Sequence, residues 1–383
     1  MSPSFPIWWM VLQIWRRANG GVMKTYRLAV IPGDGIGQEV IPEGLKVVRV
    51  AAERFSFRVT QTEFPWGCDY FLRHGMMMPE DGLDRLRDFD AIYLGAIGDP
   101  RVPDHISLWG LLLKIRKSFD LYANVRPIRL LEGIASPLAG RRAEEIDILF
   151  VRENTEGEYA GVGGRIAIST PHEVALQTSV YTRRATERIL RYAFVQAQGR
   201  RKKLAHITKS NALQYTAVFW DEVAEAVAPD YPDVQVSKFH VDAAAYNMVR
   251  HPDWFDVMVG SNLYADILTD LGAALQGSLG LAASANIDPS RAHPSMFEPV
   301  HGSAPDIAGK GVANPMAAIW TASLMLDHLG EREAADGVFQ ALRIVVQENR
   351  VRTRDLGGQS RTGEVGDAVV DALRAALSRA DMR

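Results

Sequence analysis

Cysteine and excess charge are both scarce in this sequence. Its 383 residues include a single cysteine, Cys68, so no disulfide can form within the chain, and we expect a reducing compartment, the cytoplasm. Lys and Arg number 43 against 46 Asp and Glu, and the net charge of −3 is not the strongly basic balance that nucleic acids or acidic membranes attract. The composition therefore argues against both kinds of partner.

Long hydrophobic runs are also missing. The most apolar stretch, residues 6–15, is too short to span a bilayer, and Arg16-Arg17 follow it instead of preceding it as in a signal peptide. This stretch lies in a segment, residues 1–22, whose composition differs from that of the rest. We expect residues 1–22 to be a disordered extension, with Met23 as the biological start.

A third absence is the dinucleotide-binding fingerprint G-x-G-x-x-G. The apolar strand predicted at 27–31 leads into Gly33-Asp34-Gly35-Ile36-Gly37, and no acidic residue follows at the distance expected for a ribose contact. With the helix predicted at 39–54, the segment forms a βα unit whose turn can approach a ligand. Taken alone, this turn is better explained as a structural feature.

Apolar strands and helical segments alternate along most of the chain. Strands are predicted at 57–64, 91–95, 146–151, 204–208 and 254–259, and helices at 79–87 and 313–329. This alternation predicts an α/β fold with a parallel, doubly wound sheet. Residues 161–180 break the pattern, because they are glycine-rich and then alternate with polar side chains. We expect a protruding arm there that takes part in association.

Two aspartates are placed where a metal ion could bind. Asp266 and Asp270 lie four residues apart in a segment with helical periodicity, so both project from one face, one turn apart. Their mutual repulsion favours a hard divalent cation, Mg²⁺ or Mn²⁺, between them. A solvated helix face is the alternative, although the neighbouring leucines favour a cleft.

Three arginines occupy positions suited to carboxylate recognition. Arg116 falls in a helical segment, Arg126 is extended because it precedes Pro127, and Arg152 directly follows a predicted strand. Their planar guanidinium groups can each bind a carboxylate through two hydrogen bonds, which suits a dicarboxylate ligand. Any one of them, taken singly, is better explained by a surface ion pair.

Two further features could take part in catalysis or ligand binding. Tyr159 and Lys209 could form a proton-transfer pair, with a structural role as the alternative for each. Residues 298–315 form a long loop of glycine, proline and small residues, in which Asp306 could accept hydrogen bonds from a ribose. Loops of this length in compact domains are usually functional.

Taken together, these motifs resemble those of the metal-dependent, NAD(P)-linked β-decarboxylating dehydrogenases, the isocitrate and isopropylmalate dehydrogenase family. The resemblance runs from Met23 to the C-terminus, with the motifs in order and at matching spacing. It implies an isopropylmalate dehydrogenase-like α/β fold of two domains with parallel or mixed sheets, a protruding arm in the second domain and a non-Rossmann cofactor site. The implied domains are a cofactor-binding large domain of residues 23–121 and 277–383, and a small domain of residues 122–276 with the dimer interface and the arm.

The resemblance implies a role for each matching residue. The substrate residues are Arg116, Arg126, Arg152 and Trp109, and the proton-transfer residues are Tyr159 and Lys209. The ligands of Mg²⁺ or Mn²⁺ are Asp266, Asp270 and Asp242 of the partner subunit. The cofactor residues are His301, Gly302, Ser303, Ala304, Asp306 and Asn314. Lys209 also comes from the partner subunit, so the resemblance implies a homodimer with shared sites, and a monovalent cation is an optional further cofactor.

Departures from the family pattern narrow the cofactor and substrate. Asp306 would repel a 2′-phosphate and bond a free 2′-hydroxyl, which predicts NAD. Gly110 and Leu112 argue against isocitrate, and Trp109 stands where isopropylmalate enzymes have Glu, as in the tartrate and D-malate branch. Its bulk would also shrink the pocket towards a four-carbon diacid. We therefore expect an NAD-dependent oxidative decarboxylase of D-malate or tartrate. 3-Isopropylmalate remains the alternative substrate; a non-catalytic regulatory subunit is disfavoured because every clamp and metal residue is present.

Overall fold

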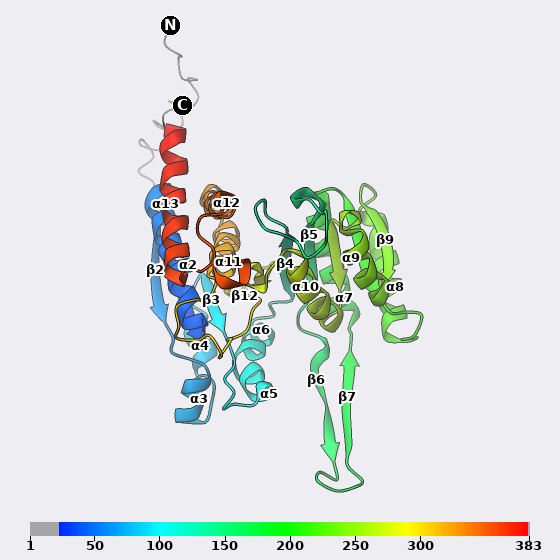
Figure 1. Ribbon diagram of the computed structural model, residues 1–383. Coiled ribbons are helices and arrows are strands. Elements are labelled where there is room, and N and C mark those ends of the chain that lie inside the picture. Colours follow the sequence, from blue (N-terminus) through cyan, green and yellow to red (C-terminus); the bar gives the residue numbers. More distant parts are fainter. Residues whose placement is uncertain (1–22, 382–383) are drawn as a thin grey trace.

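The computed structural model describes residues 23–381, so the predictions for residues 1–22 lie outside the described residues. One mixed sheet of ten strands runs through the molecule in the order β2-β1-β3-β12-β11-β4-β5-β10-β8-β9 (Figure 1). The strands are β1 (Thr25–Gly33), β2 (Arg58–Glu63), β3 (Ala91–Ala96), β4 (Ala123–Arg129), β5 (Asp147–Glu153), β8 (Lys203–Thr208), β9 (Gln235–His240), β10 (Val257–Gly260), β11 (Ala283–Ile287) and β12 (Ser295–Pro299).

The sheet consists of two parallel halves joined by antiparallel strands. β2, β1, β3 and β12 run parallel to one another, and so do β5, β10, β8 and β9. β11 and β4 connect the halves through antiparallel pairing. The predicted α/β class is confirmed, with a mixed sheet in place of a purely parallel one. The predicted domain boundary falls between β11 and β4, which are hydrogen-bonded to each other, and the division into domains stays a prediction.

Helices cover both faces of the sheet. They are α2 (Gly37–Phe55), α3 (Cys68–His74), α4 (Gly82–Leu86), α5 (Asp104–Ser107), the π-helical turn η1 (Leu108–Leu112), α6 (Leu113–Ser118), α7 (Arg183–Gln198), α8 (Thr216–Val227), α9 (Val241–Arg250), α10 (Asn262–Leu275), α11 (Met316–His328), α12 (Arg332–Glu348) and α13 (Thr362–Asp381). The helix expected at 79–87 is shorter than predicted: α4 begins at Gly82, whose N–H donates to Pro79 O at 2.9 Å in a preceding turn.

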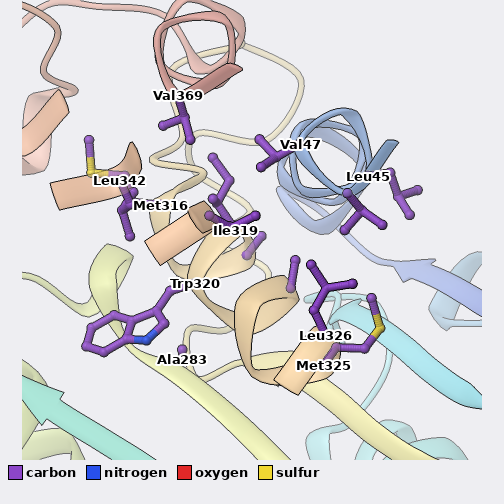
Figure 2. Packing of buried hydrophobic residues seen from close by; sticks show 14 of the residues in the cluster. Leu45, Val47, Ala283, Met316, Ile319, Trp320, Met325, Leu326, Leu342 and Val369 are labelled. Atoms are coloured by element: carbon purple, nitrogen blue, oxygen red, sulfur yellow. The ribbon is translucent and has the colours of Figure 1, made fainter. Parts of the chain in front are cut away.

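The largest hydrophobic core lies where α11 is enclosed by α2, α12 and α13. Ile319 and Leu326 of α11 meet Val47 of α2, Leu342 of α12 and Val369 of α13, and all five are buried (Figure 2). α11 is apolar on every side because other elements surround it. This core anchors the loop that precedes α11, which is the predicted cofactor loop.

The strands of the other half of the sheet present alternate residues to two different cores. Val257 and Val259 of β10 pack with α7 and α8, whereas Met258 between them packs with α9 and α10. Side chains alternate across a strand, so a continuous apolar run is buried on both faces. The strand expected at 254–259 begins only at Val257, because a 3₁₀ turn, Pro252–Trp254, precedes it.

The segment predicted to be an arm forms a two-stranded antiparallel hairpin. β6 (Gly157–Ile166) pairs with β7 (Val174–Val180), and Figure 1 shows the hairpin extending away from the main sheet. Its apolar side chains Ile166 and Leu176 are about 60% exposed. The use of this arm in association stays a prediction. No helix within residues 23–381 has the length and apolarity needed to cross a bilayer.

One histidine is enclosed in the core near the end of β8. The His206 ring stacks on Trp220 with centroids 6.2 Å apart, and its Nε2 lies 3.7 Å from Asp221 Oδ1. Burial lowers the pKa of His206 to about 4, with Asp221 opposing that shift. The folded protein therefore keeps this ring neutral at pH values where an unfolded chain would protonate it.

This difference predicts acid sensitivity. As the pH falls below about 6.5, His206 becomes protonated in the unfolded state but stays neutral in the folded state until about pH 4. The free energy of unfolding therefore decreases over that window. Between pH 7.5 and pH 5, we expect the His206→Gln variant to lose about 2 kcal/mol less free energy of unfolding than the wild type, measured from urea unfolding midpoints. The control is His172→Gln, at an exposed position of the arm. Equal pH slopes in both variants would contradict the prediction.

Candidate active site

A cavity of about 190 Å³ opens at the carboxyl ends of β3 and β12. Leu108, Leu112 and Leu113 from η1 and α6 form one apolar wall, and Ile97, Pro299 and Val300 add to the apolar lining. Its polar lining consists of Arg116, Arg126, Arg152, Tyr159, Asp266, Glu298 and His301. The volume is below the roughly 300 Å³ at which drug-sized ligand sites begin. The cavity suits a small, charged molecule.

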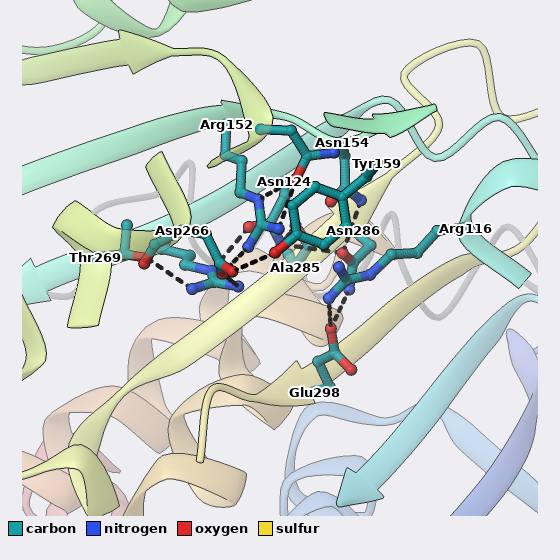
Figure 3. Close-up of polar contacts among 12 residues, drawn as sticks. Arg116, Asn124, Arg152, Asn154, Tyr159, Asp266, Thr269, Ala285, Asn286 and Glu298 are labelled. Atoms are coloured by element: carbon teal, nitrogen blue, oxygen red, sulfur yellow. Dashed lines mark hydrogen bonds and ion pairs between the residues drawn. The ribbon is translucent and has the colours of Figure 1, made fainter. Parts of the chain in front are cut away.

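The three predicted arginines meet in this cavity (Figure 3). They come from α6, from β4 and from the end of β5, and all three are buried. Arg152 is 2% exposed, and both its Nε (2.9 Å) and its Nη2 (2.6 Å) donate to Asn262 Oδ1. Arg126 donates from Nη1 to Thr269 Oγ1 at 2.6 Å. The alternative of surface ion pairing is wrong for these side chains.

Asp266 is the shared counter-ion of the cluster. It pairs with Arg152, lies 3.5 Å from Arg126 Nη2, and accepts a hydrogen bond from Tyr159 Oη at 3.0 Å. Burial acts to raise the pKa of Asp266, but the charges of Arg152 and Arg126 outweigh it and hold the pKa below its usual range. Asp266 is therefore ionised near neutral pH.

A series of hydrogen-bonded polar side chains links Arg126 to Arg116. Arg126 Nε donates to Asn124 (2.8 Å), Asn124 donates to Asn286 (3.0 Å), and Asn286 donates to Glu298 (2.9 Å), which in turn pairs with Arg116 (Figure 3). The sequence motifs did not single out this relay. Glu298 opens the glycine- and proline-rich loop, and that position was the only available signal; the asparagines lie on strands with no local motif.

The cluster carries more positive than negative charge inside a buried space. Burial, and then the charge of Arg152, lower the pKa of Arg126 to about 9, which leaves it a cation near neutral pH. An incoming dicarboxylate would relieve this repulsion while it accepts paired hydrogen bonds from the guanidinium groups. The arrangement can therefore bind a small dianion and hold a phenol, Tyr159, beside it.

The predicted metal ligands are only partly brought together. Asp266 and Asp270 lie one turn apart on α10, but Asp270 is exposed. Partial desolvation of its carboxylate raises the pKa of Asp270, as does the nearby charge of Asp266. Asp242 pairs with Lys209 of its own chain at 2.7 Å. The described part of the chain contains no group of three or more metal-ligating side chains, so one chain supplies two neighbouring carboxylates, which fit a hard cation only if another ligand is added.

The predicted cofactor loop is braced by the glycine-rich turn after β1. Ile36 N donates to Ser303 O at 2.8 Å, and a methyl group added at Gly35 would lie 2.1 Å from that oxygen. The carboxylate of Glu39 accepts from the backbone N–H groups of Gly309 (2.6 Å) and Gly311 (2.7 Å). The turn therefore has a structural function, as the sequence suggested, and it shapes a ligand-facing loop.

Two features of this loop fit a bound cofactor. His301 is buried, and its Nε2 has no hydrogen-bond partner among the described residues, while space is open beside Gly302. The Asp306 side chain is exposed, and Ala304 adopts φ 42°, which bends the loop between them. The side chain of Asn314 is already hydrogen-bonded within the chain. It donates to Asp355 at 2.9 Å and accepts at 3.0 Å from Met316 N at the start of α11.

Trp109 lies outside the cavity lining. Its ring is 4.5 Å from Lys117 Nζ, and a methyl group added at Gly161 would lie 2.9 Å from it, so the indole rests against the base of the arm. The side chain is 41% exposed. In this structure the neighbouring leucines, and not Trp109, form the apolar wall of the cavity.

Comparison with known proteins places this geometry in context. The family model described as Isocitrate/isopropylmalate dehydrogenase matches residues 27–369. A probable tartrate dehydrogenase/decarboxylase of Bacillus subtilis is 51% identical over 92% of this chain and 99% of its own length. The D-malate dehydrogenase [decarboxylating] of Escherichia coli is 51% identical over 91% and 98%. The crystal structure of isocitrate dehydrogenase from Methylococcus capsulatus superposes with a TM-score of 0.83 at 36% identity, covering 91% of this chain and 99% of that one.

The buried pair of Arg116 and Glu298 yields a stability prediction. Glu298→Gln leaves the guanidinium group buried without a counter-ion, which should cost about 2–4 kcal/mol in unfolding free energy. The control, Asp81→Asn, breaks an exposed pair with Arg85 and should cost less than about 1 kcal/mol. Chemical denaturation of both variants gives the comparison. A Glu298→Gln protein as stable as the control would show that the pair contributes nothing.

Proposed function

Because the chain belongs to the isocitrate/isopropylmalate dehydrogenase family, we propose that it is a decarboxylating dehydrogenase of the tartrate and D-malate type. The observation that carries this proposal is the convergence of three buried arginines, Asp266 and Tyr159 on one small cavity. A four-carbon 2-hydroxy diacid has two carboxylates for the guanidinium groups and a hydroxyl to place near Asp266.

The side chains that line the cavity have different roles in the proposed reaction. Arg116, Arg126 and Arg152 bind and orient the substrate carboxylates, and their burial excludes water from them. Burial, and then the charge of Asp266, raise the pKa of Tyr159, so its phenol stays protonated near neutral pH. Tyr159 Oη then donates the proton that completes the product after CO₂ has left.

Two groups that the family uses have matching residues here. The described loop from His301 to Asn314 would hold the adenosine half of a nicotinamide cofactor, with Asp306 selecting NAD over NADP by charge. Asp266 and Asp270 would hold Mg²⁺ or Mn²⁺ together with Asp242 of the partner subunit. When bound, the nicotinamide accepts hydride and the cation offsets negative charge on the substrate oxygens. Lys209 of the partner subunit would accept the hydroxyl proton.

A second substrate has one observation in its favour. Leu108, Leu112 and Leu113 form an apolar wall that could accommodate an isopropyl group, as in 3-isopropylmalate. The small volume and the relatives at 51% identity favour the four-carbon diacids instead.

Turnover measurements separate these substrates. With NAD and Mn²⁺, we expect kcat/KM for D-malate or tartrate to exceed that for 3-isopropylmalate at least about tenfold, with NADP a poorer cofactor than NAD. Tyr159→Phe should lower kcat by roughly 10²–10⁴ with little change in KM, because it removes a proton donor. Tyr70→Phe, a half-buried tyrosine on α3, is the control. A preference for 3-isopropylmalate would overturn the choice of substrate.

Shared sites make a separate prediction that can be tested by mixing. Asp266→Asn and Asp242→Asn homodimers should each be inactive, because each lacks a metal ligand in both sites. A hybrid dimer would keep one site whole, so unfolding and refolding an equal mixture should restore about a quarter of wild-type activity. The control is a mixture of the Asp266→Asn and Asp270→Asn proteins. Both residues lie on α10 of the same chain, so neither site of a hybrid dimer is whole and activity should not be restored. Absence of recovery in the first mixture would contradict shared sites.

A further inference from the structure

A second polar cavity lies at the opposite end of the strands that lead to the active site. It has a volume of about 250 Å³. Asp90 and Pro294, which directly precede β3 and β12, line it together with Tyr26 at the start of β1. These strands are parallel and their carboxyl ends reach the active-site cavity, so about five residues, roughly 16 Å, separate the two cavities.

Cationic and imidazole side chains converge on this cavity from two segments. Arg87 follows α4, and Arg291 and His293 belong to the loop between β11 and β12. Arg87 Nη1 lies 3.3 Å from His293 Nε2, and Arg291 Nη2 donates to the His328 carbonyl at 2.6 Å. Burial, and then the charge of Arg291, lower the pKa of His328 to about 4, so that ring is neutral near pH 7.

Four carboxylates lie near this cavity, and each of them has a partner of its own. Glu331, beside the lining residue Tyr26, accepts from Tyr26 Oη at 2.7 Å and pairs with Lys24 at 3.3 Å. Asp90, the only one in the lining, accepts from Arg27 N at 2.6 Å. Asp288 is buried and accepts from the backbone N–H groups of Ser290, Ala292 and His293, which fixes the loop. Asp84 contacts Arg87 at 3.2 Å but is largely exposed, where an ion pair holds its partner weakly. Two guanidinium groups therefore remain available to an anion.

The cavity is connected to the substrate-binding arginine Arg116 by packing. The His293 ring stacks on Phe119 with centroids 5.2 Å apart, and Arg87 lies 5.8 Å from the same ring. Phe119 directly follows α6, three residues after Arg116. Along the other route, β12 connects His293 to Glu298, the partner of Arg116. Arg116 is therefore linked to the cavity through Phe119, which stacks on the lining residue His293, and Glu298 is linked to it through β12, which begins directly after the lining residue Pro294.

We propose that this cavity binds a small phosphate-bearing metabolite, and that its occupancy alters how Arg116 holds the dicarboxylate substrate. The donors approach from two segments, the end of α4 and the β11–β12 loop, and a tetrahedral phosphate offers oxygens in more directions than a planar carboxylate. An anion bound by Arg87 and His293 would reposition these side chains and shift the ring that both contact, Phe119, and with it the end of α6. The effect on substrate binding rests on the proposed function; the binding site itself does not.

Calorimetric titration of the full chain with inorganic phosphate tests the site. Arg291→Gln and Arg87→Gln should each weaken phosphate binding about tenfold, ~1.4 kcal/mol, because each removes a charged donor. The matched control is Arg85→Gln: this arginine lies on α4, pairs with Asp81, is similarly exposed and does not line the cavity. It should bind phosphate like the wild type. Acetate should bind more weakly than phosphate to all four proteins.

Arg126→Gln distinguishes this cavity from the active site, where phosphate could also bind. Phosphate binding that survives Arg126→Gln and weakens in Arg291→Gln supports the proposal. Binding lost in Arg126→Gln and retained in Arg291→Gln would assign the phosphate to the active-site cavity and overturn it. The absence of saturable binding to the wild type would overturn it as well.

Kinetics test the connection to Arg116. In the wild type, saturating phosphate should change KM for the dicarboxylate at least about twofold, and this response should be lost in Arg291→Gln, whose basal kcat should be unchanged. Phosphate binding with no change in KM would refute the connection. If neither D-malate nor tartrate is turned over, the proposed function fails, while the calorimetry still decides the site.

Discussion

The burial of three guanidinium groups around one carboxylate is the constraint on which the rest of the site depends. Arg116, Arg126 and Arg152 repel one another, and a charge taken out of water is costly unless it is paired and hydrogen-bonded. Asp266 and Glu298 supply the counter-charges, and the amide side chains of Asn124 and Asn262 accept from Arg126 and Arg152. The surplus of positive charge makes the cavity attract a dianion. The affinity that we propose for a small diacid would thus follow from the burial of these cations.

This cluster also explains why the site lies in the middle of the sheet. The arginines come from a helix and two strands, and their partners come from β11, β12 and α10, so the antiparallel strands β4 and β11 place them together. The predicted cofactor loop is attached to the same region because β12 runs directly into it. α11, which packs against α2, α12, α13 and the strands β11 and β12, anchors the far end of that loop. Chain segments far apart in the sequence are therefore held to one rigid frame.

The site of a single chain is incomplete on the metal side, and the proposed dimer follows from this. Asp266 and Asp270 stand on α10, whereas Asp242 and Lys209 are paired with each other at 2.7 Å. A second copy that brings this pair to α10 would supply both a ligand and a base. The exposed apolar side chains of the arm suit association of the same kind. Catalysis and assembly would then depend on the same contacts.

The local sequence pattern was enough to predict the α/β class, the position of most strands and helices, and the arm. It also singled out the candidate arginines, tyrosine and aspartates. These features depend on periodicity and on residues that are close in sequence. Tertiary structure decided the rest. Asn124, Asn286 and Glu298 link the arginines only because β4, β11 and β12 are neighbours in the sheet, and no local motif marks that adjacency. Trp109 lies against Gly161 instead of in the cavity lining because the arm passes beside it. Side-chain chemistry can be read along the chain, but which groups are buried together depends on long-range packing.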